Sequence, residues 1–190
     1  MTEFKHSIAV DGPRNVGKTH LISQIKNRVV YKQPFAHWYT GLYAPVDGHI
    51  HNVDRSIFHF VSGMDITLLD TYNNGLLSKG IVFDRLFLSN SVYAVQAGRH
   101  KIGQSYDYLS YLVDSRYLEN CWSIYITADI VPDNRNKDQW SSYDANKTRD
   151  LYLTMIQHLE QKGYNKIIHF KNLFDKDSVT NFLEKISKIE

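Results

Sequence analysis

Residues 12–19 read Gly-Pro-Arg-Asn-Val-Gly-Lys-Thr and match the phosphate-binding pattern G-x-x-x-x-G-K-[ST] at every fixed position. Glycines at positions 12 and 17 let the backbone bend and approach a phosphate without a Cβ clash. The N–H groups of such a loop form a cradle for an anion. We expect Lys18 to reach the β- and γ-phosphates of ATP, and the Thr19 hydroxyl to bind Mg²⁺. The expected nucleotide-binding residues are Gly12, Pro13, Arg14, Asn15, Val16, Gly17, Lys18 and Thr19.

The rest of the chain lacks the signature of a GTPase. The run NKTRD at 146–150 misses the guanine-binding pattern N-K-x-D by one residue, because Asp150 stands one position too late. No D-x-x-G pattern follows a strand. The loop therefore favours a protein that binds ATP and transfers its terminal phosphoryl group.

The composition is that of one globular domain covering residues 1–190. Apolar residues make up 43% of the chain and charged residues 22%, and the net charge of +2 is too small to indicate a nucleic-acid-binding surface by itself. The lone Cys121 excludes an internal disulfide, as is typical of the cytosol. There is no apolar run of about 18 residues, so we expect no membrane span, and the first strand leaves no room for a leader peptide. We expect a cytoplasmic protein.

Five short apolar runs alternate with stretches of helical periodicity. This alternation predicts an α/β fold of the P-loop NTPase type, with a five-stranded parallel sheet and helices on both faces. Sites in such sheets lie at the carboxyl ends of the strands. The expected strands are 7–11, 28–32, 80–84, 122–128 and 166–170; the expected helices are 17–26, 53–78 with interruptions near Gly63 and Asn73–Gly75, 86–97, 106–118, 143–162 and 177–189.

The segment GIVFDRLFLSNSVYAVQAG at 80–98 resembles the D-R-[YH]-x-x-S-x-x-A-Y-Q-G segment of thymidylate kinases, and related deoxynucleoside kinases have E-R-S there. The resemblance implies a kinase with a lid, and it extends to most of the chain. Asp84 ends a predicted strand, where its carboxylate is expected to hold Mg²⁺ with Thr19 or to act as a base. Arg85 is expected to grip a phosphate in a bidentate way.

Two departures from the family bear on the acceptor. Gln33, in YKQP at 31–34, stands where thymidylate kinases have the glutamate of R-E-P and nucleoside kinases have their base. Glutamine cannot take a proton, which favours an acceptor that is already an anion. Ile66, in FHFVSGMDI at 58–66, replaces an arginine that helps to read thymine, so Phe58, His59 or Phe60 is expected either to line the acceptor pocket or to fill the core.

The polar run 132–142 occupies the position of the family's lid. Arg135 is expected to stabilise charge on the transferring group, and Arg149 to contact the nucleotide. Arg14 is expected to be an auxiliary phosphate contact; the alternative for all three arginines is simple solvation. The nine histidines show no metal-ligand spacing. The expected catalytic residues are Lys18, Asp84, Arg85 and Arg135, and the expected Mg²⁺ ligands are Thr19 and Asp84.

These observations favour an ATP- and Mg²⁺-dependent kinase of deoxynucleoside monophosphates. One alternative is a kinase acting on a hydroxyl of a nucleoside, or of a modified base or end in DNA, as some viral kinases of this type do; nucleic acid is an expected partner only in that case. A second alternative is a non-catalytic nucleotide-binding module. By analogy with thymidylate kinases, residues 53–78 and 86–118 are the expected face of a homodimer.

Overall fold

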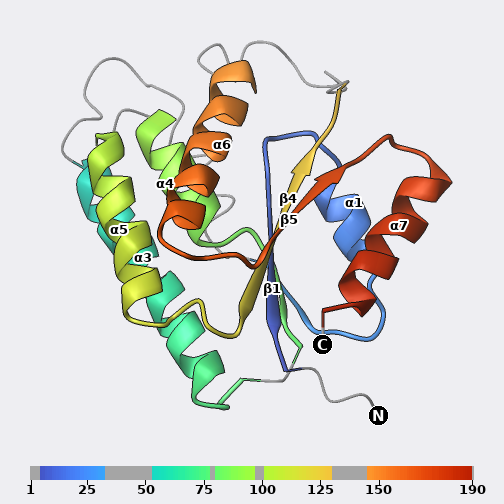
Figure 1. The fold of residues 1–190 in the computed structure, drawn as a ribbon, viewed down its shortest axis with the longest axis horizontal. Coiled ribbons are helices and arrows are strands. Elements are labelled where there is room, and N and C mark those ends of the chain that lie inside the picture. Colours follow the sequence, from blue (N-terminus) through green and yellow to red (C-terminus); the bar gives the residue numbers. More distant parts are fainter. Residues whose placement is uncertain (1–4, 33–52, 78–79, 97–100, 130–144, 190) are drawn as a thin grey trace.

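The computed structural model describes residues 5–32, 53–77, 80–96, 101–129 and 145–189. Within them, five strands form one parallel sheet in the order β2-β3-β1-β4-β5 (Figure 1). The predicted architecture is therefore confirmed. The strands are β1 (Ser7–Asp11), β2 (Val30–Lys32), β3 (Val82–Asp84), β4 (Cys121–Thr127) and β5 (Ile167–Lys171).

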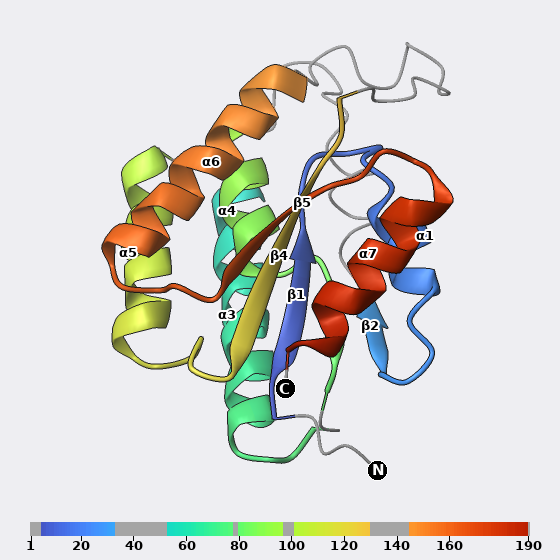
Figure 2. The same ribbon diagram turned by 45° about the vertical axis from the view of Figure 1, so that its right-hand side comes forward.

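Helices cover both faces of this sheet, because parallel strands must be joined by crossovers. In Figures 1 and 2, α1 (Lys18–Ser23) and α7 (Lys176–Ser187) lie on one face. The other face carries α3 (Val53–Asn73), α4 (Phe87–Gln96), α5 (Ile102–Asp114) and α6 (Ala145–Gln161).

The two faces hold separate hydrophobic cores, which explains why the strands read as continuous apolar runs. Along β1, Ile8 and Val10 belong to the core beneath α1 and α7, whereas Ala9 belongs to the core beneath the other four helices. In β4, Ile124 and Tyr125 divide between the two cores in the same way. This two-sided burial fixes the central strands, and with them the loops at their carboxyl ends.

The predicted interruption of α3 near Gly63 is wrong, because the helix runs without a break from Val53 to Asn73. Gly63 is exposed, and a Cβ at this position would meet no atom within 4 Å. A single glycine costs a helix about 1 kcal/mol, which tertiary packing overcomes. The interruption predicted near Asn73–Gly75 is instead the end of the helix, which stops at Asn73 rather than at residue 78, and Gly75 takes a left-handed φ of 71° there.

Two other helices have different bounds from those expected. Helix α1 ends at Ser23 rather than at residue 26, since the N–H of Ile25 bonds the carbonyl of Ile22, only three residues back, at 3.0 Å. Helix α5 occupies 102–114 rather than 106–118. Its start is fixed by the Gln104 side chain, which accepts from the Lys101 N–H at 2.9 Å.

In the part of the chain that the structure describes, none of the helices has the length and apolar character needed to cross a membrane.

Candidate functional site

The loop between β1 and α1 has a shape that only glycine permits at two positions. Gly12 has a φ of 146°, and a Cβ there would lie 2.3 Å from the carbonyl oxygen of Ile126 on β4. Gly17 has a φ of 81°, and a Cβ there would lie 2.3 Å from Nδ2 of Asn172. The neighbouring strand and the β5–α7 loop therefore leave no room for a side chain at either glycine and hold the loop in a narrow turn at the carboxyl edge of the sheet.

Lys18 is buried, and its Nζ donates a hydrogen bond to the carbonyl oxygen of Pro13 in the same loop. Burial lowers the pKa of Lys18 well below its usual value, and the positive charge of Arg85 lowers it further. A cation held inside a loop of backbone dipoles is the arrangement expected of a phosphate-binding lysine. A bound phosphate would stabilise the charged form of Lys18 through its negative charge.

Thr19 and Asp84 meet at the carboxyl edge of the sheet. Strands β1 and β3 pair with Val10 opposite Asp84, and the Thr19 hydroxyl donates to Oδ2 of Asp84 at 3.4 Å. A hydroxyl and a carboxylate are hard oxygen ligands of the kind that Mg²⁺ takes, together with waters and substrate phosphates. The described residues contain no group of three or more His, Cys, Asp or Glu side chains that would hold a metal on its own.

Arg85 follows Asp84 directly and is half-buried, with a left-handed φ of 74°. Its N–H donates to the carbonyl of Val10 at 3.1 Å, which ties the turn to β1. Its Nη1 donates to neutral oxygens only: Gly12 O at 3.4 Å, Ser89 Oγ at 3.3 Å and Tyr93 OH at 3.3 Å. Burial opposes the charge of Arg85, but Tyr93 and Tyr152 outweigh that effect and its pKa is raised overall.

Arg14 approaches the same aromatic ring as Arg85. The two guanidinium groups lie 5.7 Å and 5.1 Å from the centroid of Tyr93. The charges of Arg14 and Arg85 both act to lower the pKa of Lys18, so three cations share one small region. Such a concentration of positive charge is suited to a polyanion such as a nucleoside triphosphate.

The structure adds three residues that the sequence analysis did not select. Asp11, Ser89 and Tyr152 are fully buried and joined by hydrogen bonds. Ser89 stands at the serine of the D-R-x-x-x-S segment, so that motif could have indicated it. Neither Asp11 nor Tyr152 belongs to a motif with a known spacing from Ser89, and only the fold brings them together.

Asn172 is a fourth such residue and holds the loop from behind. Its Nδ2 donates to the carbonyl of Val16 at 2.9 Å, and its Oδ1 accepts from the N–H of Phe174 at 3.0 Å. Phe174 takes a left-handed φ of 61° and stays half exposed beside Gly17. The β5–α7 loop is therefore a wall of the candidate site.

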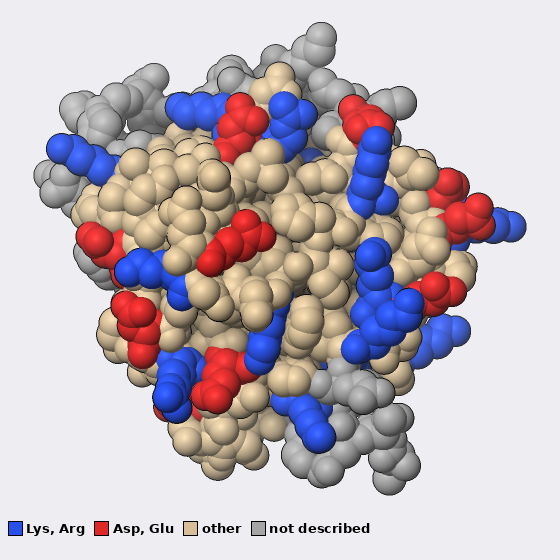
Figure 3. Space-filling view, in the orientation of Figure 1, with Lys and Arg blue, Asp and Glu red and all other residues tan. Residues whose placement is uncertain are grey.

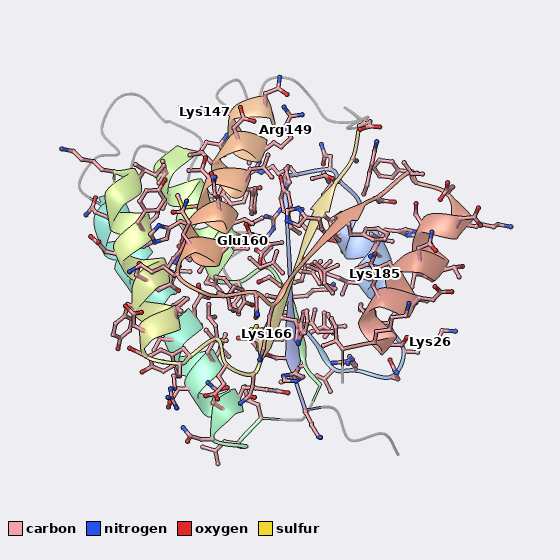
Figure 4. The ribbon with its side chains drawn as sticks, in the orientation of Figure 1. Lys26, Lys147, Arg149, Glu160, Lys166 and Lys185 are labelled. Atoms are coloured by element: carbon pink, nitrogen blue, oxygen red, sulfur yellow. The ribbon has the colours of Figure 1, made fainter. Side chains whose placement is uncertain are left out.

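Other predicted residues are not brought into this cluster. Arg149 lies near the upper end of α6 (Figure 4), where it is exposed and pairs with Asp150 at 3.6 Å. Arg135 and the lid segment 132–142 lie outside the described residues, as does Gln33. Phe58 is buried in the core, with its ring 5.6 Å from that of Tyr108, so it does not line an open pocket.

Several solved structures are similar to this chain. A thymidylate kinase from Candida albicans matches with a TM-score of 0.64 and 14% identity, over 99% of this chain and 93% of that chain. A deoxyadenosine kinase from M. mycoides, solved with dCMP and dCDP, matches with a TM-score of 0.60 and 15% identity over 96% and 100% of the two chains. The NadR protein in complex with NR matches with a TM-score of 0.58 and 13% identity, over 98% of this chain but 53% of that chain.

No protein-family model matches the sequence, and no curated protein sequence does. The likeness to the three structures shows the fold, which is the α/β P-loop NTPase fold.

Proposed function

We propose that this protein is a kinase that transfers the γ-phosphoryl group of ATP to a deoxynucleoside monophosphate. One observation carries the proposal: Lys18, Arg14 and Arg85 lie close together at a loop whose turn requires glycine at positions 12 and 17, beside the Thr19–Asp84 pair. Phosphoryl transfer asks a protein mainly for alignment and neutralisation of charge, and these groups supply both.

In this proposal the loop of residues 12–19 binds the triphosphate, with Lys18 against its β- and γ-phosphates. Thr19 and Asp84 would hold Mg²⁺, which when bound neutralises phosphate charge. Arg85 binds the acceptor phosphate through the guanidinium nitrogens other than Nη1, because Nη1 already donates to protein oxygens. An acceptor phosphate oxygen forms the new bond to the γ-phosphorus, while the bond to the β–γ bridging oxygen breaks. The products are ADP and a nucleoside diphosphate.

A monophosphate fits the charge of the site better than a nucleoside does. Its phosphate is already an anion, so it needs no base, and it provides a partner for the charge of Arg85. Among the described residues, Asp84 is engaged by the Thr19 hydroxyl, which suits a metal ligand better than a base. We assign Arg14 to the phosphates as an auxiliary contact, and Arg135 and Arg149 to the closed complex.

The alternative acceptor, a base or an end within DNA, requires a basic surface for the polymer. On the face shown in Figure 3, lysines and arginines are mixed with aspartates and glutamates over most of the surface, and several adjoin one another on the right, beside α7. A polymer needs a basic field that continues across a face, and this group does not extend that far.

The test is transfer of label from γ-labelled ATP with Mg²⁺ to three groups of acceptors: dTMP, dCMP and dGMP; the free nucleosides; and DNA. We expect a labelled nucleoside diphosphate. Asp84→Asn should lower kcat about 100-fold and raise the Mg²⁺ concentration for half-maximal rate, because a charged ligand is lost. Lys26→Ala, which removes an exposed lysine, is the matched control and should keep the wild-type rate.

Label on a nucleoside or on DNA instead would replace the proposed acceptor with the alternative. Binding of ATP without transfer to any acceptor would leave a nucleotide-binding module and contradict the assignment as an enzyme.

A further inference from the structure

Ser89 lies at the centre of a buried polar cluster between β1, α4 and α6. Its Oγ donates to Oδ1 of Asp11, lies 2.7 Å from the hydroxyl of Tyr152, and accepts from Nη1 of Arg85 at 3.3 Å. A serine hydroxyl has one donor and two acceptor positions. The one hydrogen of the Ser89 hydroxyl goes to Asp11, so Tyr152 is the donor in its bond to Ser89, and all three positions of the hydroxyl are used.

Asp11 is anchored toward the start of α4. Its Oδ1 also accepts from the backbone N–H of Ser89 at 3.1 Å and of Leu86 at 3.4 Å. Its Oδ2 is buried and has no hydrogen-bond partner among the described residues. Asp11 therefore has one oxygen without a hydrogen bond, and the charges of Arg85 and Lys18 act on this carboxyl group.

Arg85 is a cation whose charge acts on the Asp11 carboxyl group. Arg85 and Asp11 bond the same hydroxyl oxygen, so the two charged groups lie within two hydrogen-bond lengths of each other. Within the described part of the chain, Arg85 nevertheless forms no ion pair and is held by neutral oxygens and the Tyr93 ring. No carboxylate of the described residues is therefore hydrogen-bonded to the Arg85 guanidinium, which leaves its charge available to an anionic substrate.

We propose that Ser89, oriented by Tyr152, is a positioning residue that stands between Asp11 and Arg85 and keeps the Arg85 guanidinium available to a substrate phosphate. This inference rests on the proposed function. Without the Ser89 hydroxyl, Asp11 loses a strong donor and Arg85 loses an acceptor, so a direct Asp11–Arg85 ion pair satisfies both. That pair would turn Arg85 away from the phosphate site.

The kinetic test compares Ser89→Ala with Ser105→Ala, which removes another buried serine whose Oγ bonds a backbone carbonyl, that of Ser91, at 3.1 Å. Ser89→Ala should lower kcat/KM for the acceptor about 30-fold, because a displaced clamp misplaces the acceptor, and change the Kd of ATP less than about threefold. Ser105→Ala should change neither. Equal losses in acceptor kinetics for both variants would overturn the proposal.

A second pair of variants tests the role of the Tyr152 hydroxyl. Tyr152→Phe removes the donor to Ser89 and should lower kcat/KM for the acceptor about fivefold. Tyr164→Phe also removes a buried hydroxyl, which donates to the carbonyl of Cys121 at 2.9 Å, and should leave acceptor kinetics unchanged. A wild-type kcat/KM for Tyr152→Phe would contradict the role of Tyr152.

The decisive variant is the combination of Ser89→Ala with Asp11→Asn. Once Asp11 has lost its charge it no longer captures Arg85, so the double variant should recover at least a third of the activity lost in Ser89→Ala. A double variant that is weaker than Ser89→Ala would overturn the proposal.

A crystal structure of Ser89→Ala gives a reading that does not depend on activity. The proposal expects the Arg85 guanidinium within hydrogen-bond distance of Asp11 Oδ2, and an unmoved Arg85 would refute it. If the wild type transfers no phosphate at all, the proposed function fails, but this structural test still decides what Ser89 does.

Discussion

At the scale of single residues, Lys18 is expected to make the affinity for ATP depend on pH. Its pKa is lowered by burial and by Arg85, so the ammonium loses its proton at a lower pH than an ordinary lysine does. Only the charged form attracts a triphosphate, and the bound triphosphate in turn favours the charged form. The affinity for ATP should therefore fall as the pH rises through the lowered pKa.

The measurement is the Kd of ATP by calorimetry over a series of pH values that ends below the titration of an ordinary lysine. We expect a progressive loss that approaches tenfold per pH unit, and for Lys18→Ala a Kd about 100-fold weaker with little dependence on pH. A flat profile in the wild type would show that Lys18 does not contact the phosphates.

At the scale of elements, two glycines have opposite effects on stability: Gly12 is required by the loop after β1, whereas Gly63 weakens the exposed side of α3. Gly12 directly follows β1, where a Cβ would lie 2.3 Å from the carbonyl oxygen of Ile126, whereas a Cβ at Gly63 on α3 would meet no atom within 4 Å. Gly12→Ala should lower the free energy of unfolding by about 3 kcal/mol or more, because neither its φ nor the strand backbone accommodates a methyl group. Gly63→Ala should raise it by about 1 kcal/mol through helix propensity.

Urea denaturation of the two variants tests this contrast directly. A Gly12→Ala protein as stable as the wild type would mean that β1 and β4 do not hold the loop in the observed turn.

The periodicity of apolar residues predicts where helices occur but not where they end. Periodicity predicts the existence of α3 and α5, but not the continuity of α3 through Gly63 or the end of α5. After Asp114, Arg116 takes a left-handed φ of 60°, and Tyr117 donates back to the carbonyl of Leu112 at 3.0 Å. No glycine marks this stop, because packing of Tyr117 and Leu118 against the core sets it.

At the scale of the whole molecule, Arg28 ties the beginning of the sheet to the last helix. Its Nη1 donates to the carbonyl of His6 at 3.1 Å and its Nη2 to that of Ile189 at 2.8 Å, both on the side opposite the candidate site. Arg28→Met should lower the free energy of unfolding by about 2 kcal/mol, since two carbonyls lose a charged donor.

Lys26→Met is the matched control, because Lys26 is an exposed cation two residues away (Figure 4), and it should leave the denaturation midpoint unchanged. The Kd of ATP should be the same for both variants. If Arg28→Met unfolds at the wild-type midpoint, the two hydrogen bonds do not hold the chain ends together.

The sequence by itself determined the features that depend on neighbouring residues. The spacing of Gly12, Gly17, Lys18 and Thr19 indicates the loop, and the alternation of apolar runs with helical stretches predicts the parallel sheet. These patterns are local, because a turn that accepts a phosphate and a strand buried on both faces each impose their residue types within a few positions.

The tertiary structure alone decided which distant residues meet. The strand order places Asp84 beside β1 and Thr127 beside Asn172, whose side chain reaches Val16 across 156 positions of sequence. Likewise, Tyr152 meets Ser89 only because α6 packs against α4. Such contacts have no local signature, since hydrogen bonds between elements depend on how two cores stack on one sheet and not on residue spacing.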